Sequence, residues 1–546
     1  MVFIRDIKRG DKIYRYKVET YREDGKVKQK AEYVGKVVKY HNKETVIPRR
    51  ELIEPTSISE VRSSGLLSIL YRIAEEWEIP EIVEAVSRTA GENDYGNAIL
   101  LLALNHITGR HALDRIAEWY RRSVLYPYLG EHDLFTKKRL LAAMDSLTDE
   151  DEYGNILDYT VQLSQKMYEL SSRLTKESNS GMIYDITEVT SYSENNVYAS
   201  LGYSPNNENS KLTKVCLITN RATRLPVMLF LNNGNLPDKS TVDEMLNRLR
   251  IVKIDKKKSH MIFDRGIVSE ENVRLHKNAN IEVIAGLTLR RKDVVELVSS
   301  IEEKEFVHHY NAVKHAGGFA YIVERPFTFG GIDGKAVVCL VPRLQENVRA
   351  ARIADIKNAI QKLEVRNQKH WSKTPKNDIQ KIAESIIAPV KQFIKLDIDK
   401  ENKNASYKIN EALLDDEALR DGRFALFSTD YNLRKEEIFE AYFSRDTVEK
   451  AFRVYKGELE LPPLRHWKTK RLMSYLQICF ISYLLQSYLM YKARNAGMKD
   501  GWTEIRFALN EIQQVVVNTF NGEKTRYTNI TPKHKFILEK LGYNLL

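Results

Sequence analysis

Four residues in the last third of the sequence are spaced so that they can share one face of a helix. Tyr442, Arg445, Glu449 and Lys456 lie at offsets 0, 3, 7 and 14 in AYFSRDTVEKAFRVYKGEL. At about 100° per residue these positions fall within an arc of roughly 60°, and a helix of this length extends about 21 Å. Such a stripe can follow several phosphates. Taken alone it is weak evidence, because Arg445 and Glu449 also form an ordinary i, i+4 ion pair of a solvated helix.

Two aspartates follow short apolar runs that are typical of buried strands. Asp185 ends the run MIYD, and Asp264 ends the run MIFD before Arg265 and Gly266. Aspartate often terminates strands, so either one alone indicates only structure. Adjacent central strands can, however, bring both carboxylates to the same place in a sheet. Together with Glu449 they make a predicted cluster of three carboxylates.

Three carboxylates are suitable ligands for hard divalent cations, which prefer oxygen donors. The cluster predicts a site for two Mg²⁺ ions, for which Mn²⁺ can substitute. In such a site one ion activates a water or a 3′ hydroxyl and the other stabilises the leaving oxygen. This is the chemistry of in-line phosphoryl transfer. Arginine and lysine next to the acids make a nucleic acid the expected phosphodiester.

The composition is consistent with a polyanionic partner. The 546 residues include 85 Lys+Arg and 74 Asp+Glu, a net charge of +11. Basic side chains release counterions from phosphate backbones, although a well-solvated basic surface explains the same excess. With 25 Gly and 14 Pro, collagenous and largely disordered classes are excluded. The widely separated Cys216, Cys339 and Cys479 provide neither a disulfide framework nor a zinc site.

One segment is long enough to span a membrane. Leu472 to Tyr491 contains no charged side chain over 20 residues. Serines and glutamines such as Ser474, Gln477 and Ser482 interrupt it, and these groups are costly in lipid without partners. We therefore predict a buried core helix and no membrane partner. The charged start of the chain contains no signal-peptide core, so we expect a cytoplasmic protein.

Hydrophobic periodicity divides the chain into six regions. Alternation around EDGK predicts a β unit whose basic residues either contact phosphate or form a solvated face, and a helical period then predicts a DNA-binding region. Three strand runs followed by strand–helix–strand units predict an α/β fold with a mixed sheet. We predict an N-terminal β unit at 1–55, a helical DNA-binding region at 56–178, a catalytic core at 179–288 and 434–520, an α+β insertion at 289–433, and a C-terminal tail at 521–546.

The combined motifs resemble those of the prokaryotic insertion-sequence DDE transposases, in the branch with the signature Tyr-x2-Arg-x3-Glu-x6-Lys. That signature is complete here as Tyr442, Arg445, Glu449 and Lys456. YDITEVT resembles the family's first acid motif, FDRG its second, and Gly234-Asn235 its turn from strand to helix. The similarity extends over about residues 181–495.

The resemblance implies an RNase H-like fold of the retroviral-integrase superfamily, interrupted by an insertion before the helix that bears Glu449. It implies catalytic and metal-binding roles for Asp185, Asp264 and Glu449, and DNA-backbone binding by Tyr442, Arg445 and Lys456. It also implies a homodimer that acts on double-stranded DNA at transposon ends and at the target, as a nucleoid-associated enzyme. Trp371 of the insertion is expected to pack in its core.

We therefore predict a cut-and-paste transposase that cleaves DNA at transposon ends and transfers the strands to target DNA. A noncatalytic regulator derived from a transposase is one alternative, which the three intact acids disfavour. An RNase H-like structure-specific nuclease that cuts but does not join is another. Among competing acids, Glu188 is predicted to face the other side of its strand, and Asp446 and Glu458 lie off the stripe.

Overall fold

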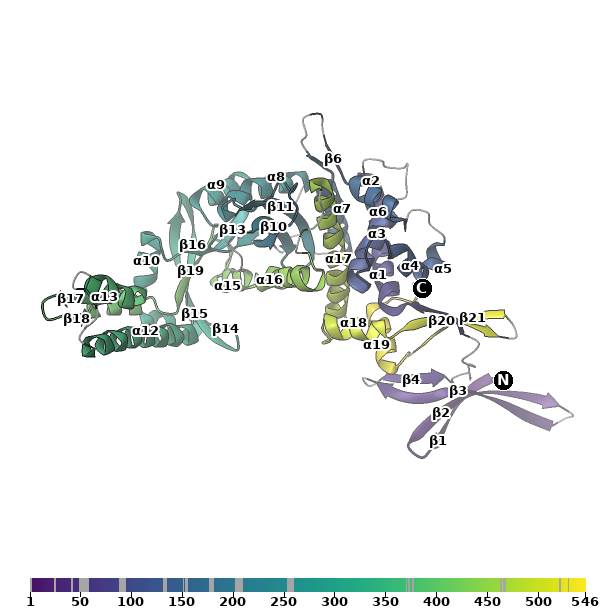
Figure 1. Ribbon diagram of the computed structural model, residues 1–546. Coiled ribbons are helices and arrows are strands. Elements are labelled where there is room, and N and C mark those ends of the chain that lie inside the picture. The colour runs from purple at the N-terminus through teal and green to yellow at the C-terminus, as the bar shows by residue number, and fades with distance from the viewer. Residues whose placement is uncertain are drawn as a thin grey trace.

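The structure is a computed structural model of the chain. It describes residues 2–23, 26–40, 43–48, 58–87, 95–130, 135–150, 152, 156–175, 181–201, 210–252, 260–369, 371, 374–375, 378–461, 464, 468–519, 522–528 and 530–546. Figure 1 shows an elongated, bent molecule with a central α/β unit, a small outlying lobe at one end, and a helical unit followed by a four-stranded sheet at the other.

A ten-stranded mixed sheet forms the centre, in the order β11-β10-β8-β12-β13-β19-β16-β15-β14 with β9 paired to β10. Strand β8 is antiparallel to β10 and parallel to β12, β12 is parallel to β13, and β13 is antiparallel to β19. This confirms the predicted mixed sheet. Its strands are β8 Met182–Thr190, β9 Ser200–Leu201, β10 Lys211–Asn220, β11 Pro226–Asn233, β12 His260–Phe263, β13 Glu282–Leu287, β14 Ala312–His315, β15 Gly318–Phe329, β16 Ile332–Leu340 and β19 Arg423–Ser428.

The two faces of this sheet are packed into separate hydrophobic cores. Because strand side chains alternate, Ile183 of β8 belongs to one core and Tyr184 to the other. On the side of Tyr184 lie η3 Asp238–Thr241, α8 Val242–Val252, α9 Glu270–Asn278 and α10 Lys292–Ser299, with α11 Glu303–Phe306 and η5 His309–Asn311 farther along the chain. On the side of Ile183 lie α15 Lys435–Phe443, α16 Asp446–Arg453, the π-helical turn η8 Val454–Glu458 and α17 Thr469–Asn495.

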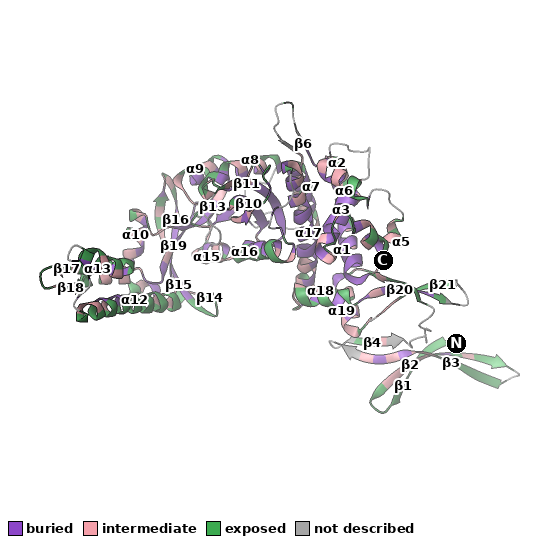
Figure 2. Cartoon of the chain, viewed as in Figure 1, coloured by how far each residue is buried: buried purple, intermediate pink, exposed green. Residues whose placement is uncertain are grey.

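The long helix α17 connects the sheet to the helical unit. It is long and apolar enough to cross a membrane, but 94% of its most apolar window is buried inside the protein. Figure 2 shows it buried along most of its length. Several of its internal polar groups have partners: Ser482 donates to the backbone oxygen of Ala103 at 3.0 Å, and Gln477 donates to that of Leu229 at 3.0 Å. The predicted core helix is confirmed.

The helical unit packs around α17 and shares its core with the sheet. It comprises α1 Gly65–Glu76, α2 Ile79–Val86, α3 Tyr95–Thr108, α4 Ile116–Arg121, α5 Leu125–Leu129, α6 Lys137–Asp145, β6 Thr148–Glu150, β7 Ile156–Asp158 and α7 Thr160–Thr175. The C-terminal elements α18 Trp502–Asn510, β20 Gln513–Thr519, β21 Gly522–Tyr527 and α19 Pro532–Leu541 pack here too. Strand β20 pairs with both β21 and β5 Ile58–Ser63, so a sheet crosses the predicted boundary at residue 521.

The predicted insertion of 289–433 is divided in the structure. Strands β14, β15, β16 and β19 extend the central sheet. The outlying lobe contains α12 Pro342–Gln368, α13 Ile379–Ile387, η7 Ala388–Val390, β17 Ile394–Asp399, β18 Asn404–Ile409 and α14 Glu411–Ala418. Trp371 is buried there, as expected, and its indole donates to Asn367 at 2.9 Å. The apolar strands of this region are long enough to continue the sheet, which periodicity alone did not reveal.

The N-terminal unit is a separate four-stranded antiparallel sheet of order β1-β2-β3-β4. Its strands are β1 Val2–Arg9, β2 Lys12–Glu23, β3 Lys26–Tyr40 and β4 Lys43–Pro48. The C-terminal helix α19 contacts β3, and Lys535 donates to the backbone oxygen of Val46 at 3.1 Å. The two ends of the chain therefore meet on the same side of the helical unit (Figure 1).

Candidate active site

Asp185 lies within a central strand rather than at its end. Strand β8 continues five residues beyond it, to Thr190. Its parity matches that of Ile183, so it points to the side of the sheet that α15 and α16 cover. The side chain is partly buried, and one carboxylate oxygen accepts a hydrogen bond from the backbone N–H of Ile186 at 2.9 Å.

Asp264 follows directly after β12, the parallel neighbour of β8. Met261 pairs with Met182 and Ile262 with Ile183, so the register continued by two residues sets Asp264 level with Asp185. The backbone N–H of Arg265 donates to the Asp264 carboxylate at 2.8 Å. The two predicted aspartates therefore lie side by side on paired strands.

The spacing predicts one straight α-helix for the segment that bears Tyr442, Arg445, Glu449 and Lys456. The structure shows that this prediction is wrong. Helix α15 ends at Phe443, α16 begins at Asp446, and a π-helical turn follows at Val454. Tyr442 belongs to α15, Arg445 lies at the junction, Glu449 is on α16, and Lys456 is in the π-helical turn. The spacing places these residues on one face only if the α-helical period is constant, and the junction and the wider π-helical turn both change that period.

Tyr442 and Arg445 nonetheless contact Asp264, and Arg445 also contacts Glu449. The Tyr442 hydroxyl donates to Asp264 Oδ1 at 3.0 Å, and Arg445 Nη1 lies 2.5 Å from the same oxygen. The Arg445 guanidinium also lies 4.5 Å from the centre of the Tyr442 ring and 3.8 Å from Glu449 Oε1. Arg445 therefore connects the second acid to the third.

Burial and the neighbouring charges affect the two aspartates in opposite directions. Burial raises the pKa of Asp185 to about 6; the Ile186 N–H and Arg445 oppose this shift, while the negative charges of Asp264 and Glu449 add to it. Burial also raises the pKa of Asp264, but Arg445 and the hydrogen bonds from Arg265 and Tyr442 outweigh it, so the net pKa is lowered. Of the two aspartates, Asp185 is thus the one whose negative charge is less compensated.

The donor set fits a divalent cation chemically, because it consists of three carboxylates around one arginine. A cation next to Asp185 would favour its charged form and so oppose the effect of burial on its pKa. In the part of the chain that the structure describes, however, no three acidic, histidine or cysteine side chains already form a ligand shell. The positively charged guanidinium of Arg445 lies between Asp264 and Glu449. The side chain of Glu449 is 56% exposed. Binding a metal here requires the glutamate to turn toward the aspartates.

Comparison with known protein families identifies the chain. A family model described as a transposase DDE domain matches residues 176–485, which is more than half of the chain. This chain belongs to the DDE transposase family. The matched residues include all six predicted site residues, from Asp185 to Lys456. The match does not distinguish the branch defined by the Tyr-x2-Arg-x3-Glu-x6-Lys signature.

Similarity outside the family model is weak. Among curated proteins, none matches this transposase sequence. A solved structure, the cryo-EM structure of a piggyBac transposase synaptic complex with hairpin DNA, aligns with 82% of this chain and 79% of that chain at 9% identity and a TM-score of 0.35. A TM-score this low does not establish a common fold, so membership of the family rests on the sequence match.

Among the described residues, no ion pair or hydrogen bond joins Lys456 of this transposase to the other three signature residues. It is exposed in the π-helical turn η8. Partial burial of its amine lowers its pKa, and the carboxylate that opposes this shift is Glu188, not one of the three predicted catalytic acids. Glu188 also forms an ion pair with the buried Lys214 of β10, at 3.4 Å. Lys456 is therefore near Glu188, toward the end of β8.

The other competing acids have local partners. Asp446 forms an ion pair with Lys450 one turn along α16. Glu458 accepts a hydrogen bond from Gln486 of α17 at 3.2 Å. Neither contact involves the two aspartates.

Gly286 is a site residue that the motif reasoning missed. It lies in β13, and a Cβ atom there would come within 2.6 Å of the Tyr442 hydroxyl oxygen. The absence of a side chain at Gly286 therefore lets Tyr442 lie against the sheet and reach Asp264. The available signal was a glycine inside the apolar strand run IEVIAG, a position that often marks the close approach of another group.

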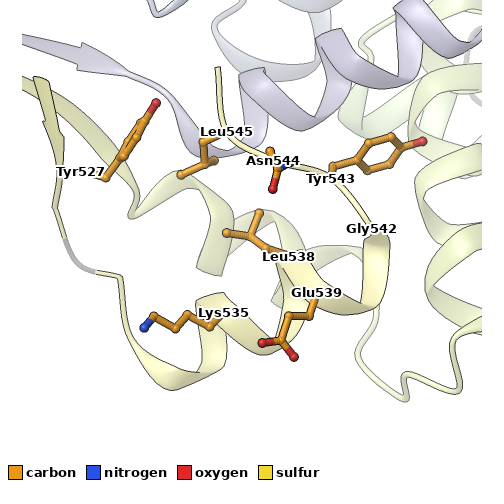
Figure 3. A pocket seen from close by; sticks show the side chains of 8 residues that line it. All are labelled: Tyr527, Lys535, Leu538, Glu539, Gly542, Tyr543, Asn544 and Leu545. Carbon is orange, nitrogen blue, oxygen red and sulfur yellow. The ribbon is translucent and has the colours of Figure 1, made fainter. Parts of the chain in front are cut away.

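A hollow of about 530 Å³ lies elsewhere in the transposase, at the C-terminal end of the chain. Lys535, Leu538 and Glu539 of α19 line it together with Tyr527 and the segment 542–545 (Figure 3). Figure 1 shows this end of the chain beside the helical unit, away from α15 and α16. The hollow is therefore separate from the acidic site.

Proposed function

We propose that this transposase cleaves DNA at the ends of a mobile element and joins the freed 3′ ends to target DNA, with Asp185, Asp264 and Glu449 as its catalytic acids. The observation that carries the proposal is the pairing of β8 and β12, whose register sets the two aspartates level with each other. Arg445 supports the third assignment, because it contacts both Asp264 and Glu449. Partly buried aspartates with shifted pKa values, next to a charged partner, are expected at a catalytic site rather than on a solvated surface.

The three carboxylates would hold Mg²⁺, for which Mn²⁺ can substitute. Two such ions, when bound, supply activation of the attacking oxygen and stabilisation of the leaving oxygen in phosphoryl transfer. The protein's own contribution is to orient these acids. Backbone N–H groups and Tyr442 fix the two aspartates, while the exposed Glu449 is free to turn.

Arg445 and Tyr442 are proposed to contact the DNA backbone at the scissile phosphate. Arg445 keeps its Nε buried without a hydrogen-bond acceptor in the described part of the chain. A phosphate oxygen that replaces Asp264 as its partner would satisfy such a donor, because guanidinium groups bind phosphate in a bidentate manner. Lys456, on its separate turn, is proposed to contact a phosphate farther along the same strand.

The central strands support the RNase H-like arrangement that the resemblance implies. Strands β11, β10 and β8 are antiparallel neighbours, and β8, β12 and β13 are parallel neighbours. We further propose that the enzyme belongs to a prokaryotic insertion sequence, works as a homodimer on paired ends, and follows a cut-and-paste pathway.

A cleavage and joining assay tests the proposal. The full chain is incubated with Mg²⁺ and a duplex that carries the inverted repeats flanking the coding region, and with a target plasmid. We expect nicks at the repeat ends and covalent joining to the plasmid, both abolished by EDTA and by Asp185→Asn.

The products separate the proposed enzyme from its alternatives. Cutting without joining, even when a pre-cleaved 3′-hydroxyl end is supplied, would indicate a structure-specific nuclease. Specific binding to the repeats without any cutting by the wild-type chain would indicate a noncatalytic regulator.

A further inference from the structure

The N-terminal sheet has two faces of different chemistry, which the strand register identifies. Residues that pair across antiparallel strands point to the same side, and each strand alternates sides along its length. Tyr16 pairs with Arg5 on β1 and with Tyr33 on β3. Lys17, its neighbour in β2, pairs with Ile4 and Glu32 and points to the opposite side.

The side of Lys17 carries charges of both signs, and we call it the mixed face. Its basic strand residues are Lys8, Arg15, Lys17, Lys26, Lys28 and Lys30, and its acidic ones are Asp6, Glu19, Glu23, Glu32 and Glu44. Several of these are paired: Arg15 with Asp6 at 2.7 Å and with Glu44 at 3.7 Å, and Lys28 with Glu23 at 2.7 Å. Such a face is nearly neutral and well solvated.

The side of Tyr16 carries positive charge only, and we call it the basic face. Among the strand residues whose side chains the structure describes, its charged positions are Arg5, Arg9, Lys12, Arg22 and Lys36, with no aspartate or glutamate. Four of the five are exposed and Lys36 is partly buried. Within the described part of the chain, no ion pair or side-chain hydrogen bond involves any of them. Their charge is therefore uncompensated.

Aromatic side chains lie between these charges. The ring of Tyr33 lies 5.3 Å from that of Tyr16 and 6.1 Å from that of Tyr14, centre to centre. A register shift after Arg15 aligns Tyr33 with the two tyrosines of β2. Phe3 extends the same side and is 38% exposed. Basic and aromatic residues on one face, with acids confined to the other, are typical of nucleic-acid-binding sheets.

The size of the basic face fits duplex DNA. Lys12 and Arg22 stand at opposite ends of β2, about 34 Å apart at roughly 3.4 Å per residue. One turn of B-DNA is also about 34 Å long. Figure 1 shows the sheet projecting from the helical unit, and Figure 2 shows the strand ends exposed. Buried apolar side chains lie on both faces. Val37 belongs to the mixed face, on the strand that α19 contacts, and Val18 belongs to the centre of the basic face, where it pairs with Phe3 and Ala31.

We propose that the basic face of the N-terminal sheet binds the backbone of duplex DNA outside the cleavage site. This inference rests on the proposed function, because it assigns a second DNA contact to the same enzyme. Arg5, Arg9, Lys12, Arg22 and Lys36 bind phosphates, while Tyr14, Tyr16 and Tyr33 pack against the sugar edge. The sheet thus adds affinity and orientation at a distance from the acids.

Two matched variants of the full chain test the assignment. The first changes all five basic-face residues to Ala, and the second changes five mixed-face lysines, Lys8, Lys17, Lys26, Lys28 and Lys30, to Ala. Both remove five positive charges from the same strands. Binding is measured in EDTA by fluorescence anisotropy, on a fluorescein-labelled duplex of about 40 base pairs, roughly four helical turns. The salt concentration is varied for each protein.

We expect the basic-face variant to lose affinity and to lower the log-log salt slope by about 0.9 per phosphate contact, up to about 4.5 for five contacts. The mixed-face variant keeps a slope close to that of the wild type. Equal effects of the two variants would overturn the inference, because net charge alone would then explain the loss. So would a basic-face variant that binds like the wild type.

Two further measurements guard against misfolding and against a different partner. The single change Arg22→Glu, at an exposed strand end, should lower the salt slope of DNA binding without changing the melting temperature of the protein. The basic-face variant is also tested on phosphatidylserine vesicles. If it no longer binds the vesicles but keeps the wild-type salt slope of DNA binding, the partner of this face is a membrane surface and the inference is refuted. A wild-type chain that binds the duplex through this face but never cleaves would refute the proposed catalysis while supporting the inference.

Discussion

The central sheet and the N-terminal sheet both gather charged residues, but they do so in different surroundings. In the central sheet, Asp185 and Asp264 are partly buried next to a single arginine, and burial raises the pKa of Asp185 to about 6. On the N-terminal sheet, residues such as Arg5 and Arg22 are exposed and uncompensated. Burial strengthens each individual interaction, whereas exposed charges are screened and act through their number. We therefore expect large effects from single changes at the first site and small, additive effects at the second.

The sharpest test of this contrast is Asp264→Asn. The change should reduce DNA cleavage by roughly 10³-fold or more, because loss of about 4 kcal/mol of charge stabilisation has that effect. DNA binding should stay nearly constant, measured by anisotropy alongside a cleavage time course. The control is Asp446→Asn on α16, whose carboxylate pairs with Lys450. Full activity of a folded Asp264→Asn protein would contradict the expectation that single changes at the acidic site have large effects.

Glu449→Gln tests whether the exposed acid belongs with the buried pair. We expect both hydrolysis and joining to be lost, by roughly 10²-fold or more, if one site serves both steps. A gel assay that follows nicked and joined products separately measures each step. Glu440→Gln, on α15, should retain both. Retention of activity by Glu449→Gln would leave Asp185 and Asp264 without a third ligand and would require another acid.

Gly286→Ala should have an intermediate effect. The new methyl group would meet the Tyr442 hydroxyl at 2.6 Å and displace a side chain that hydrogen-bonds Asp264. A shift of about 1 Å near reacting groups can cost roughly 10²-fold in rate, so we expect a loss of 10- to 100-fold in cleavage. Gly266→Ala is the control. It adds a methyl group two residues after Asp264 in the sequence, where the new Cβ atom would have no neighbour within 4 Å. Equal rates for the two variants would show that the position of Tyr442 is not critical.

The smallest effect is expected for Lys456→Ala. This lysine is exposed and, among the described residues, forms no ion pair with the Arg445 cluster, so its loss should remove one phosphate contact and lower the salt slope by about 0.9. Anisotropy with repeat-end DNA at several salt concentrations measures the slope. Lys277→Ala on α9, on the opposite side of the sheet, should leave it unchanged. A drop in cleavage with an unchanged salt slope would instead indicate that Lys456 acts together with the acidic site and not as an exposed phosphate contact.

The sequence predicted the nature of the candidate site better than its geometry. The strand runs that carry Asp185 and Asp264 were recognisable because short apolar segments before an acid indicate buried strands. The spacing from Tyr442 to Lys456 predicts one straight helix, whereas the structure has two helices and a π-helical turn. A spacing in sequence specifies angles only while the helical period is constant, and nothing in the sequence marked where it changes.

Local patterns by themselves determined the classes of element: the mixed sheet, the buried helix of residues 469–495, and the presence of three acids with a basic neighbour. They depend on side-chain periodicity and on chemical type, which are properties of short segments. Only the tertiary structure decided that β12 pairs with β8 so that the acids are level, that β14, β15, β16 and β19 extend the central sheet, and that Gly286 makes room for Tyr442. It also separated the N-terminal charges into a basic and a mixed face. Strand partners, register and close approach depend on residues far apart in the chain, and no local pattern contains them.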